Sequence, residues 1–319
     1  MRSALSVVNE LKADKLKVRG IIVSGGEPLM HPHLREILES VRPVTNEIVL
    51  ATNGTLVNSS NVVWITELID AVTLSFDSND AAKFAEFRGQ SNVLNRVDNA
   101  LRLFTQHGVQ VIAQTTLSKY NVDLLDSMAL FLISRGASSW IVRTPLRIGR
   151  AKLNEQHFLT HSEARAKQPL FENIRERYAS HFDVLTIGNR FQWSYDTEFS
   201  STKHKPGFAT CAAGIALATI RPDGTMVPCA IFGDTTSREI HSPPVWAGRF
   251  LSEWRNSKSF KTMRSIKLEA ISPCGRCSKL PDVCDGGCRA LGFHAFGTVY
   301  GPDPDCNYVR SFCGGVFAE

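Results

Sequence analysis

Cysteine is missing from the first 210 residues of this 319-residue chain, and all eight cysteines lie between Cys211 and Cys313. So uneven a distribution indicates two parts with different tasks. In a reducing compartment, clustered cysteines more often bind metal than form disulfides. We therefore expect a first part with an ordinary hydrophobic core, followed by a part built around thiol groups.

The chain also lacks a run of 18 apolar residues, so the sequence predicts no membrane-spanning helix. The first 18 residues carry scattered charges and have no apolar middle of the kind found in secretory signals. The net charge of +5 is mild, and no block of five or more like charges occurs. These absences argue against nucleic acid or a membrane surface as a partner and favour a cytoplasmic location.

Short apolar runs alternate with amphipathic segments through the first 144 residues. The apolar runs end in glycine or other turn residues, as buried parallel strands do. The segments between them carry apolar residues at helical spacing. This alternation predicts a parallel sheet covered by helices, as a barrel or part of one. The five expected strands are 20–25, 47–54, 71–78, 109–116 and 138–144.

Polar or glycine-rich sequences follow four of these strands, namely SGGEP, ATNG, SFDS and TPLRIGR. Ligands of parallel sheets collect at the carboxyl ends of the strands. Each sequence alone is also compatible with an ordinary turn, because Gly, Pro, Asn, Ser and Asp are turn residues. Their repetition at one edge of the sheet favours a binding site there. Residues 151–208 are less regular and are expected to form a connector, with a helix broken near Pro169.

The second part of the chain contains a cysteine array. The sequence RPDG predicts a hairpin that presents Cys229 just after its turn. Cys-x-x-Cys spacing lets two thiolates turn toward one soft metal centre. Seven or eight thiolates fit two [4Fe–4S] clusters or two zinc ions, and their softness and spacing do not distinguish these two. A disulfide framework is the least favoured alternative, because nothing in the sequence indicates secretion.

Taken in order, these segments resemble radical S-adenosylmethionine (radical SAM) enzymes with a C-terminal SPASM domain. SGGEPLMHP resembles the turn after the second strand of their partial barrel, and ATNG and SFDS resemble the ends of the next two strands. FRG (87–89) and TPLRIGRA (144–151) resemble segments that follow. The cysteine order Cys-x12-Gly-x4-Cys, Cys-x2-Cys-x6-Cys-x3-Cys and a later Cys resembles the SPASM array, whose flanks CDGGCRA and DPDC fit.

The resemblance implies the fold class and the domains. We expect an α/β protein with a partial (β/α)6, TIM-like barrel that lacks its first strand, joined to a cysteine-rich SPASM domain. The implied boundaries are 1–150 for the partial radical SAM core, 151–208 for the connector and 209–319 for the SPASM iron–sulfur domain.

The resemblance also implies a site for S-adenosylmethionine. The backbone of Gly25, Gly26, Glu27 and Pro28 would lie along the methionine amino group, since glycine allows close approach. Ser75 and Arg88 would hold the ribose and the carboxylate. Alternatively, Ser75 is a helix cap and Arg88 an ordinary surface residue. Weaker candidates for the adenosyl pocket are Thr52, Asn53 and Leu146.

By the same resemblance, the cysteines would hold two auxiliary [4Fe–4S] clusters. The first would be bound by Cys211, Cys229 and Cys288. The second would be bound by Cys274, Cys277, Cys284 and Cys306. The fourth ligand of the first cluster stays open, because either Cys313 or a substrate could supply it.

One defining feature of the family is missing. The Cys-x3-Cys-x2-Cys motif, which binds the catalytic cluster, does not occur in this sequence. Two explanations compete: an N-terminal truncation, and a degenerate protein that binds without radical chemistry. The retained SGGEP turn and cysteine array favour truncation. We expect a catalytic cluster only if the missing N-terminus is present, and this chain alone to be inactive.

The implied parent activity is modification of a peptide or protein substrate by a 5′-deoxyadenosyl radical, with a low-potential electron donor as a further partner. Sulfatase-maturing members carry an aspartate where this chain has Ala230, which argues against that activity. A small metabolite such as a tetrapyrrole remains an alternative substrate. A non-catalytic scaffold that binds zinc or iron–sulfur clusters is the alternative of another class.

Overall fold

The computed structural model describes the chain from residue 2 onward, with gaps. The described residues are 2–146, 148–187, 211–235, 237–246, 248–278, 284, 286–304, 306 and 309. The chain divides into two compact units, residues 3–188 and residues 189–319. The eighth cysteine, Cys313, lies outside the described residues.

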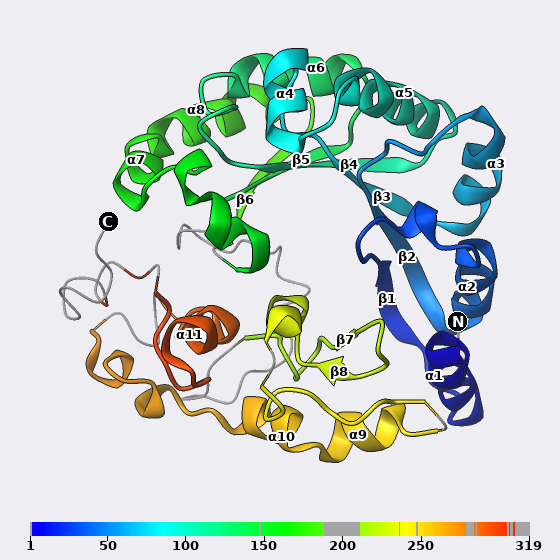
Figure 1. Ribbon diagram of the computed structural model, residues 1–319, viewed down its shortest axis with the longest axis vertical. Coiled ribbons are helices and arrows are strands. Elements are labelled where there is room, and N and C mark those ends of the chain that lie inside the picture. The colour runs from blue at the N-terminus through cyan, green and yellow to red at the C-terminus, as the bar shows by residue number, and fades with distance from the viewer. Residues whose placement is uncertain are drawn as a thin grey trace. The chain divides into compact units, whose positions relative to one another are not determined.

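The first unit is built on a six-stranded sheet in which every neighbouring pair of strands is parallel (Figure 1). The strands follow the chain order β1-β2-β3-β4-β5-β6. Within the described residues β1 and β6 are not paired with each other, so the sheet is open. The strands are β1 (Val18–Val23), β2 (Thr45–Thr52), β3 (Ala71–Ser75), β4 (Gln110–Thr116), β5 (Ser139–Arg143) and β6 (Asp183–Ile187).

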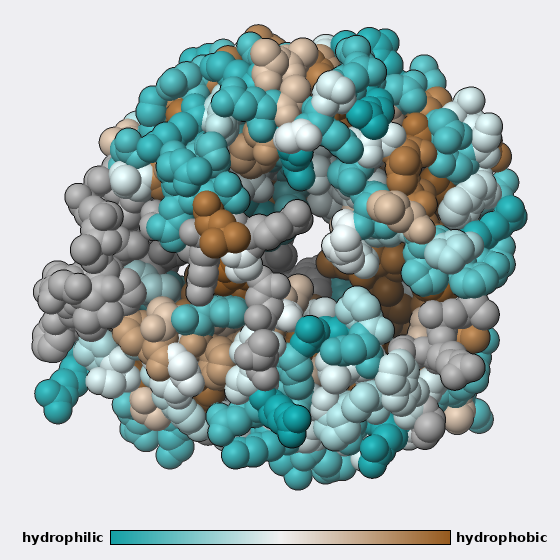
Figure 2. All heavy atoms as spheres, in the orientation of Figure 1, coloured by the Kyte–Doolittle hydropathy of each residue, from teal (hydrophilic) through white to brown (hydrophobic). Residues whose placement is uncertain are grey.

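Helices connect these strands, and α2, α3, α5, α6 and α8 cover one face of the curved sheet (Figure 1). Figure 2 shows mostly hydrophilic side chains on the outer surface of this layer. The helices are α1 (Arg2–Ala13), α2 (Leu34–Val41), α3 (Ser59–Leu68), α4 (Ala81–Arg88), α5 (Val93–Gln106), α6 (Leu125–Ser134), α7 (His161–Ala166) and α8 (Gln168–Tyr178). Short 3-10 helices are η1 (Pro28–Met30), η2 (Arg42–Val44) and η3 (Gly149–His157).

All five predicted strands are confirmed, and the predicted helix near Pro169 is broken into α7 and α8. The sequence analysis missed β6, which lies inside the segment interpreted as a connector. This strand has only five residues, DVLTI, and opens on an aspartate. Its pairing partner Ser139 is 44 residues earlier in the chain, and such long-range pairing leaves no local pattern.

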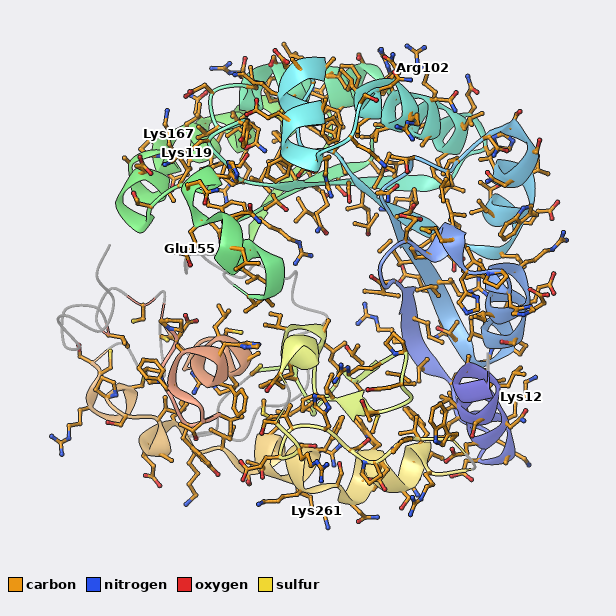
Figure 3. The ribbon with its side chains drawn as sticks, viewed as in Figure 1. Lys12, Arg102, Lys119, Glu155, Lys167 and Lys261 are labelled. Atoms are coloured by element: carbon orange, nitrogen blue, oxygen red, sulfur yellow. The ribbon has the colours of Figure 1, made fainter. Side chains whose placement is uncertain are left out.

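The core of the first unit lies between the sheet and its helices. The largest buried side chain is Trp140, whose ring stacks on Phe182. Its indole N–H donates to Thr115 Oγ1 at 2.8 Å, so the one polar atom of this ring has a partner. On the outer surface, by contrast, Arg102 projects from α5 (Figure 3) and donates to Asp98 at 3.0 Å.

The second unit has little regular structure in its described residues. A two-stranded antiparallel hairpin confirms the turn predicted at RPDG, and Cys229 follows its second strand. The elements are β7 (Thr219–Ile220), β8 (Met226–Val227), η4 (Ala230–Asp234), α9 (Phe250–Asn256), α10 (Lys258–Ser265), η5 (Leu268–Ala270), η6 (Cys274–Arg276) and α11 (Arg289–Phe296). Five cysteines lie in or against its hydrophobic core, namely Cys211, Cys229, Cys274, Cys288 and Cys306. In the described part of the chain, no helix is long and apolar enough to span a membrane.

Gly54, which follows β2, combines a left-handed backbone with close packing. Its φ is +75°, and a Cβ there would lie 2.5 Å from Leu74 Cδ1 and 3.2 Å from Ala100 Cβ. We expect Gly54→Ala to lower the free energy of unfolding by about 2–4 kcal/mol through backbone strain and overpacking. Gly89→Ala is the matched control, because Gly89 has φ +63° but no heavy atom within 4 Å.

The control isolates the backbone cost, for which we expect about 1–2 kcal/mol. Urea unfolding of both variants measures the difference. An equal decrease in the free energy of unfolding of both variants would show that overpacking against Leu74 does not contribute to the loss of stability.

Candidate functional site

The first candidate site begins at the turn after β1. Gly25 and Gly26 are exposed, Gly25 has φ +155°, and no heavy atom lies within 4 Å of a Cβ built at either position. The next residue, Glu27, precedes the 3-10 helix η1, where Pro28 is buried. The backbone of Gly25 and Gly26 is therefore accessible at the carboxyl edge of the sheet. The C-terminal end of the turn is fixed by the buried Pro28.

The carboxylate of Glu27 fixes this turn to the end of the neighbouring strand. It accepts hydrogen bonds from Thr52 Oγ1 at 2.6 Å and from the backbone N–H of Asn53 at 2.8 Å. It also accepts from the N–H of Leu29 at 3.2 Å, which caps η1. Thr52 Oγ1 in turn accepts from the N–H of Gly54 at 3.0 Å. One side chain thus joins the SGGEP and ATNG segments into a single unit.

Two further predicted residues follow β3, the next strand. Ser75 is half-buried at its end, and α4 is capped by Asp80, so Ser75 is not the helix cap. Arg88 ends α4, and its Nε donates to Asp77 Oδ2 at 2.7 Å. A second guanidinium nitrogen contacts the same oxygen. Arg88 is therefore not an ordinary surface arginine but the partner of a buried carboxylate.

Asp77 is the residue of this site that the sequence analysis quoted within SFDS but did not assign. It is 1% exposed, and its Oδ1 accepts from the N–H of Thr116 at 2.8 Å. Burial raises the pKa of Asp77, while Arg88 and the Thr116 N–H act in the opposite direction. Asn121 completes the arrangement by donating to the backbone oxygens of Asp77 and Thr116, both at 2.9 Å.

Parallel pairing brings most of the predicted residues to one edge. Because β1, β2 and β3 are neighbours in register, the SGGEP turn, Thr52, Asn53 and Ser75 follow the carboxyl ends of three adjacent strands. Leu146 follows β5, two strands further along the same sheet, and is half-buried. Among the contacts of the described residues, none places Leu146 beside the other candidates.

The second candidate site lies among the cysteines of the second unit. Cys211, Cys229 and Cys288 are near enough to one another to interact electrostatically. Burial, with a smaller contribution from the neighbouring Cys211, raises the pKa of Cys229 to about 11. Burial likewise raises the pKa of Cys288 to about 12. A buried thiolate is costly without a cation or a metal, so these groups suit binding by soft metal centres.

The other predicted ligands are Cys274, Cys277, Cys284 and Cys306. Cys274 and Cys277 lie at the two ends of η6, joined by a 2.8 Å hydrogen bond from the N–H of Cys277 to the oxygen of Cys274. Cys284 is half-buried and Cys306 is buried. No disulfide joins the seven described cysteines. In the part of the chain that the structure describes, no group of three or more His, Cys, Asp or Glu forms a site for a metal ion.

Comparisons with known proteins agree with this architecture. The model of the Radical SAM superfamily matches residues 1–131. The AdoMet-dependent heme synthase of Oleidesulfovibrio alaskensis is 26% identical over 297 residues, covering 90% of this chain and 74% of that protein. The mycofactocin maturase MftC of Mycobacterium ulcerans is 24% identical over 307 residues, covering 96% of this chain and 79% of that protein.

Solved structures show the same fold along nearly the whole chain. Streptococcus suis SuiB bound to S-adenosylmethionine matches with a TM-score of 0.73 at 17% identity, covering 96% of this chain and 69% of SuiB. SuiB bound to precursor peptide SuiA matches with a TM-score of 0.72 at 16% identity, covering 96% and 68%. Residues 1–131 therefore match the Radical SAM superfamily by sequence, and the solved structures share the fold of the chain.

Proposed function

We propose that this chain is the S-adenosylmethionine-binding and auxiliary-cluster portion of a radical SAM enzyme that modifies a peptide or protein. The observation that carries the proposal is the turn at Glu27, which leaves Gly25 and Gly26 open at the edge of the sheet. We assign S-adenosylmethionine to this edge and the [4Fe–4S] clusters to the cysteines of the second unit. When bound and reduced by one electron, S-adenosylmethionine supplies hydrogen-atom abstraction from an unactivated C–H bond.

The residues of the edge fit the ligand chemically. The carbonyl groups of an open glycine turn accept hydrogen bonds from an ammonium group without steric hindrance. The guanidinium of Arg88 is 35% exposed and has five N–H donors, more than Asp77 uses. We assign to it the carboxylate of the ligand, which an arginine binds through paired donors. Asp77 then acts as a positioning residue, because it holds the guanidinium in place.

The cysteines fit iron–sulfur clusters in their donor chemistry. Thiolates are the ligands of such clusters, and Cys211, Cys229 and Cys288 are buried or half-buried and within electrostatic reach of one another. We assign these three to one cluster, and Cys274, Cys277, Cys284 and Cys306 to another. Their task is to hold two redox centres in a largely apolar environment, which tunes the potential of each.

A peptide substrate is favoured by the names of similar proteins. MftC is named a maturase, and SuiB has been solved with a precursor peptide. A tetrapyrrole is the second candidate, because proteins named heme synthase match 90% of this chain. Titration of the cluster-loaded chain with protoporphyrin IX separates the two. We expect no saturable shift of the porphyrin absorption band, whereas a stoichiometric shift would favour the tetrapyrrole.

Metal analysis tests the cluster assignment. After anaerobic purification and reconstitution with iron and sulfide, we expect about eight irons and about eight sulfides per chain, the content of two [4Fe–4S] clusters. Stoichiometric zinc without acid-labile sulfide would contradict the assignment and favour the scaffold alternative.

The Glu27→Gln variant tests the anchored turn. An amide cannot accept through both of its terminal atoms, so either the N–H of Asn53 or the donors from Thr52 and Leu29 lose their acceptor. We expect S-adenosylmethionine to bind about tenfold more weakly, corresponding to about 1.4 kcal/mol. Isothermal titration calorimetry measures the affinity. Glu36→Gln is the control, because the exposed Glu36 bonds only to His33 among the described contacts; equal affinities for the two variants would exclude the proposed role of Glu27.

The Arg88→Lys variant tests the carboxylate contact. Lysine keeps the charge but loses the planar fork that can serve Asp77 and a second carboxylate together. We expect affinity for S-adenosylmethionine to fall about tenfold or more, since a charged hydrogen bond contributes about 1.5–3 kcal/mol. Arg102→Lys is the matched control, because Arg102 also pairs with an aspartate but on the outer face of α5 (Figure 3). Unchanged affinity in Arg88→Lys would remove Arg88 from the site.

A further inference from the structure

Arg289, the first residue of α11, is a fully buried cation in the cysteine-rich unit. Its side chain has 0% exposure, and it directly follows Cys288. The guanidinium donates to the backbone oxygens of Gly301 at 2.9 Å, Val299 at 3.2 Å and Gly287 at 3.2 Å. A fourth hydrogen bond goes to the oxygen of Gly286. Arginine is almost never fully buried unless a compensating charge is near, so this burial requires an explanation.

The four carbonyl groups belong to two segments that carry predicted ligands. Gly286 and Gly287 lie between Cys284 and Cys288, and the segment 299–301 leads to Cys306. The two segments are also joined by Asp303, whose Oδ2 accepts from the N–H of Cys288 at 2.8 Å. Arg289 therefore joins the segment that precedes Cys288 to the segment that precedes Cys306.

Helix α11 also packs tightly against the segment 301–302. A Cβ at Gly292 would lie 2.5 Å from the oxygen of Gly301 and 3.0 Å from that of Pro302. The helix therefore contacts the 301–302 backbone directly. The guanidinium of Arg289 is held in place by this contact and by its own hydrogen bonds.

Carbonyl dipoles alone do not neutralise a full positive charge. Among the described residues, the acidic groups whose charges act on Arg289 are Cys211, Cys274, Cys288 and Asp303. These thiols come from both sets of proposed ligands: Cys211 and Cys288 from the first, and Cys274 from the second. Arg289 is thus within electrostatic reach of both proposed clusters.

We propose that Arg289 is the shared counter-cation of the two clusters and the positioning residue that holds their ligand segments together. This inference rests on the proposed function, because it requires anionic clusters at the cysteines. Two thiolate-bound clusters carry net negative charge and repel each other, and a cation close to both lowers that repulsion. It also stabilises the reduced form of a cluster, which is the more negative one, and so raises the reduction potential.

Two substitutions at Arg289 separate charge from hydrogen bonding. Arg289→Gln removes the charge and keeps an N–H donor, while Arg289→Lys keeps the charge and loses the planar fork. Arg264→Gln is the matched control. Arg264 also donates to backbone oxygens of this unit, those of Gly214 at 2.8 Å and Trp254 at 2.7 Å. Burial lowers the pKa of Arg264, and no described cysteine contributes to that shift.

The chains are purified anaerobically and reconstituted, and iron, sulfide and reduction potentials are measured. We expect Arg289→Gln to hold about half the iron of the wild-type chain, because one cluster is lost. Any retained cluster should show at least a tenfold lower ratio of reduced to oxidised form at a fixed potential, a shift of about 59 mV for one electron. Arg264→Gln should keep wild-type iron content and potentials. Arg289→Lys should keep the wild-type potential of any cluster that it holds, because the charge remains, but should lose part of the iron, because three donors cannot serve four carbonyl groups.

The outcomes distinguish this inference from the proposed function. A wild-type chain without iron and sulfide overturns both. A loaded wild-type chain together with an Arg289→Gln variant of equal iron content and potential overturns the inference alone. If Arg289→Gln does not fold, Arg289→Lys decides: clusters with wild-type potentials support the counter-cation, and lowered potentials overturn it.

Discussion

The carboxylate of Glu27 is the interaction on which the proposed ligand edge depends. Parallel pairing of β1 and β2 brings their carboxyl ends together, and Glu27 then joins the two turns through Thr52 and the N–H of Asn53. Because this anchor lies at the C-terminal end of the glycine turn, Gly25 and Gly26 stay open to a ligand. The glutamate of SGGEP thus has a structural role: it holds the glycine turn against the end of β2. Its side chain is occupied by the protein, and we assign only backbone groups of the turn to the ligand.

Buried charge is the feature that the two candidate sites share. In the first unit Asp77 is buried against Arg88, and in the second unit Arg289 is buried among thiols and carbonyl groups. Both arrangements cost desolvation energy, which only well-placed partners offset. At the sheet edge the pair orients a guanidinium, and near the cysteines the cation offsets thiolate charge. The sites differ in their ligands but use the same physical means of holding a charge in position.

Local sequence patterns predicted the repeating part of this fold well. Apolar runs ending in glycine or other turn residues marked five strands, since burial of a parallel strand on both faces leaves an apolar run in the sequence. Strand β6, the Asp77–Arg88 pair and the Arg289 hydrogen bonds were not predicted, because each joins residues whose relation appears only after folding. The resemblance to radical SAM enzymes was recognised from ordered motifs, and the match of residues 1–131 to the Radical SAM superfamily agrees with it. The individual ligand assignments stay predictions, because they depend on groups that local patterns do not place.

Hydrogen–deuterium exchange with and without S-adenosylmethionine tests the central claim most directly, because it locates the ligand on the chain without requiring turnover. The account predicts slower exchange in the peptides that contain Gly25–Glu27 and Asn53–Thr55, whose backbone N–H groups lie at the ligand edge. Peptides from the outer helix α5 should exchange equally in both conditions. Protection confined to other parts of the chain, or no protection at saturating ligand, would contradict the placement of the cofactor at this edge.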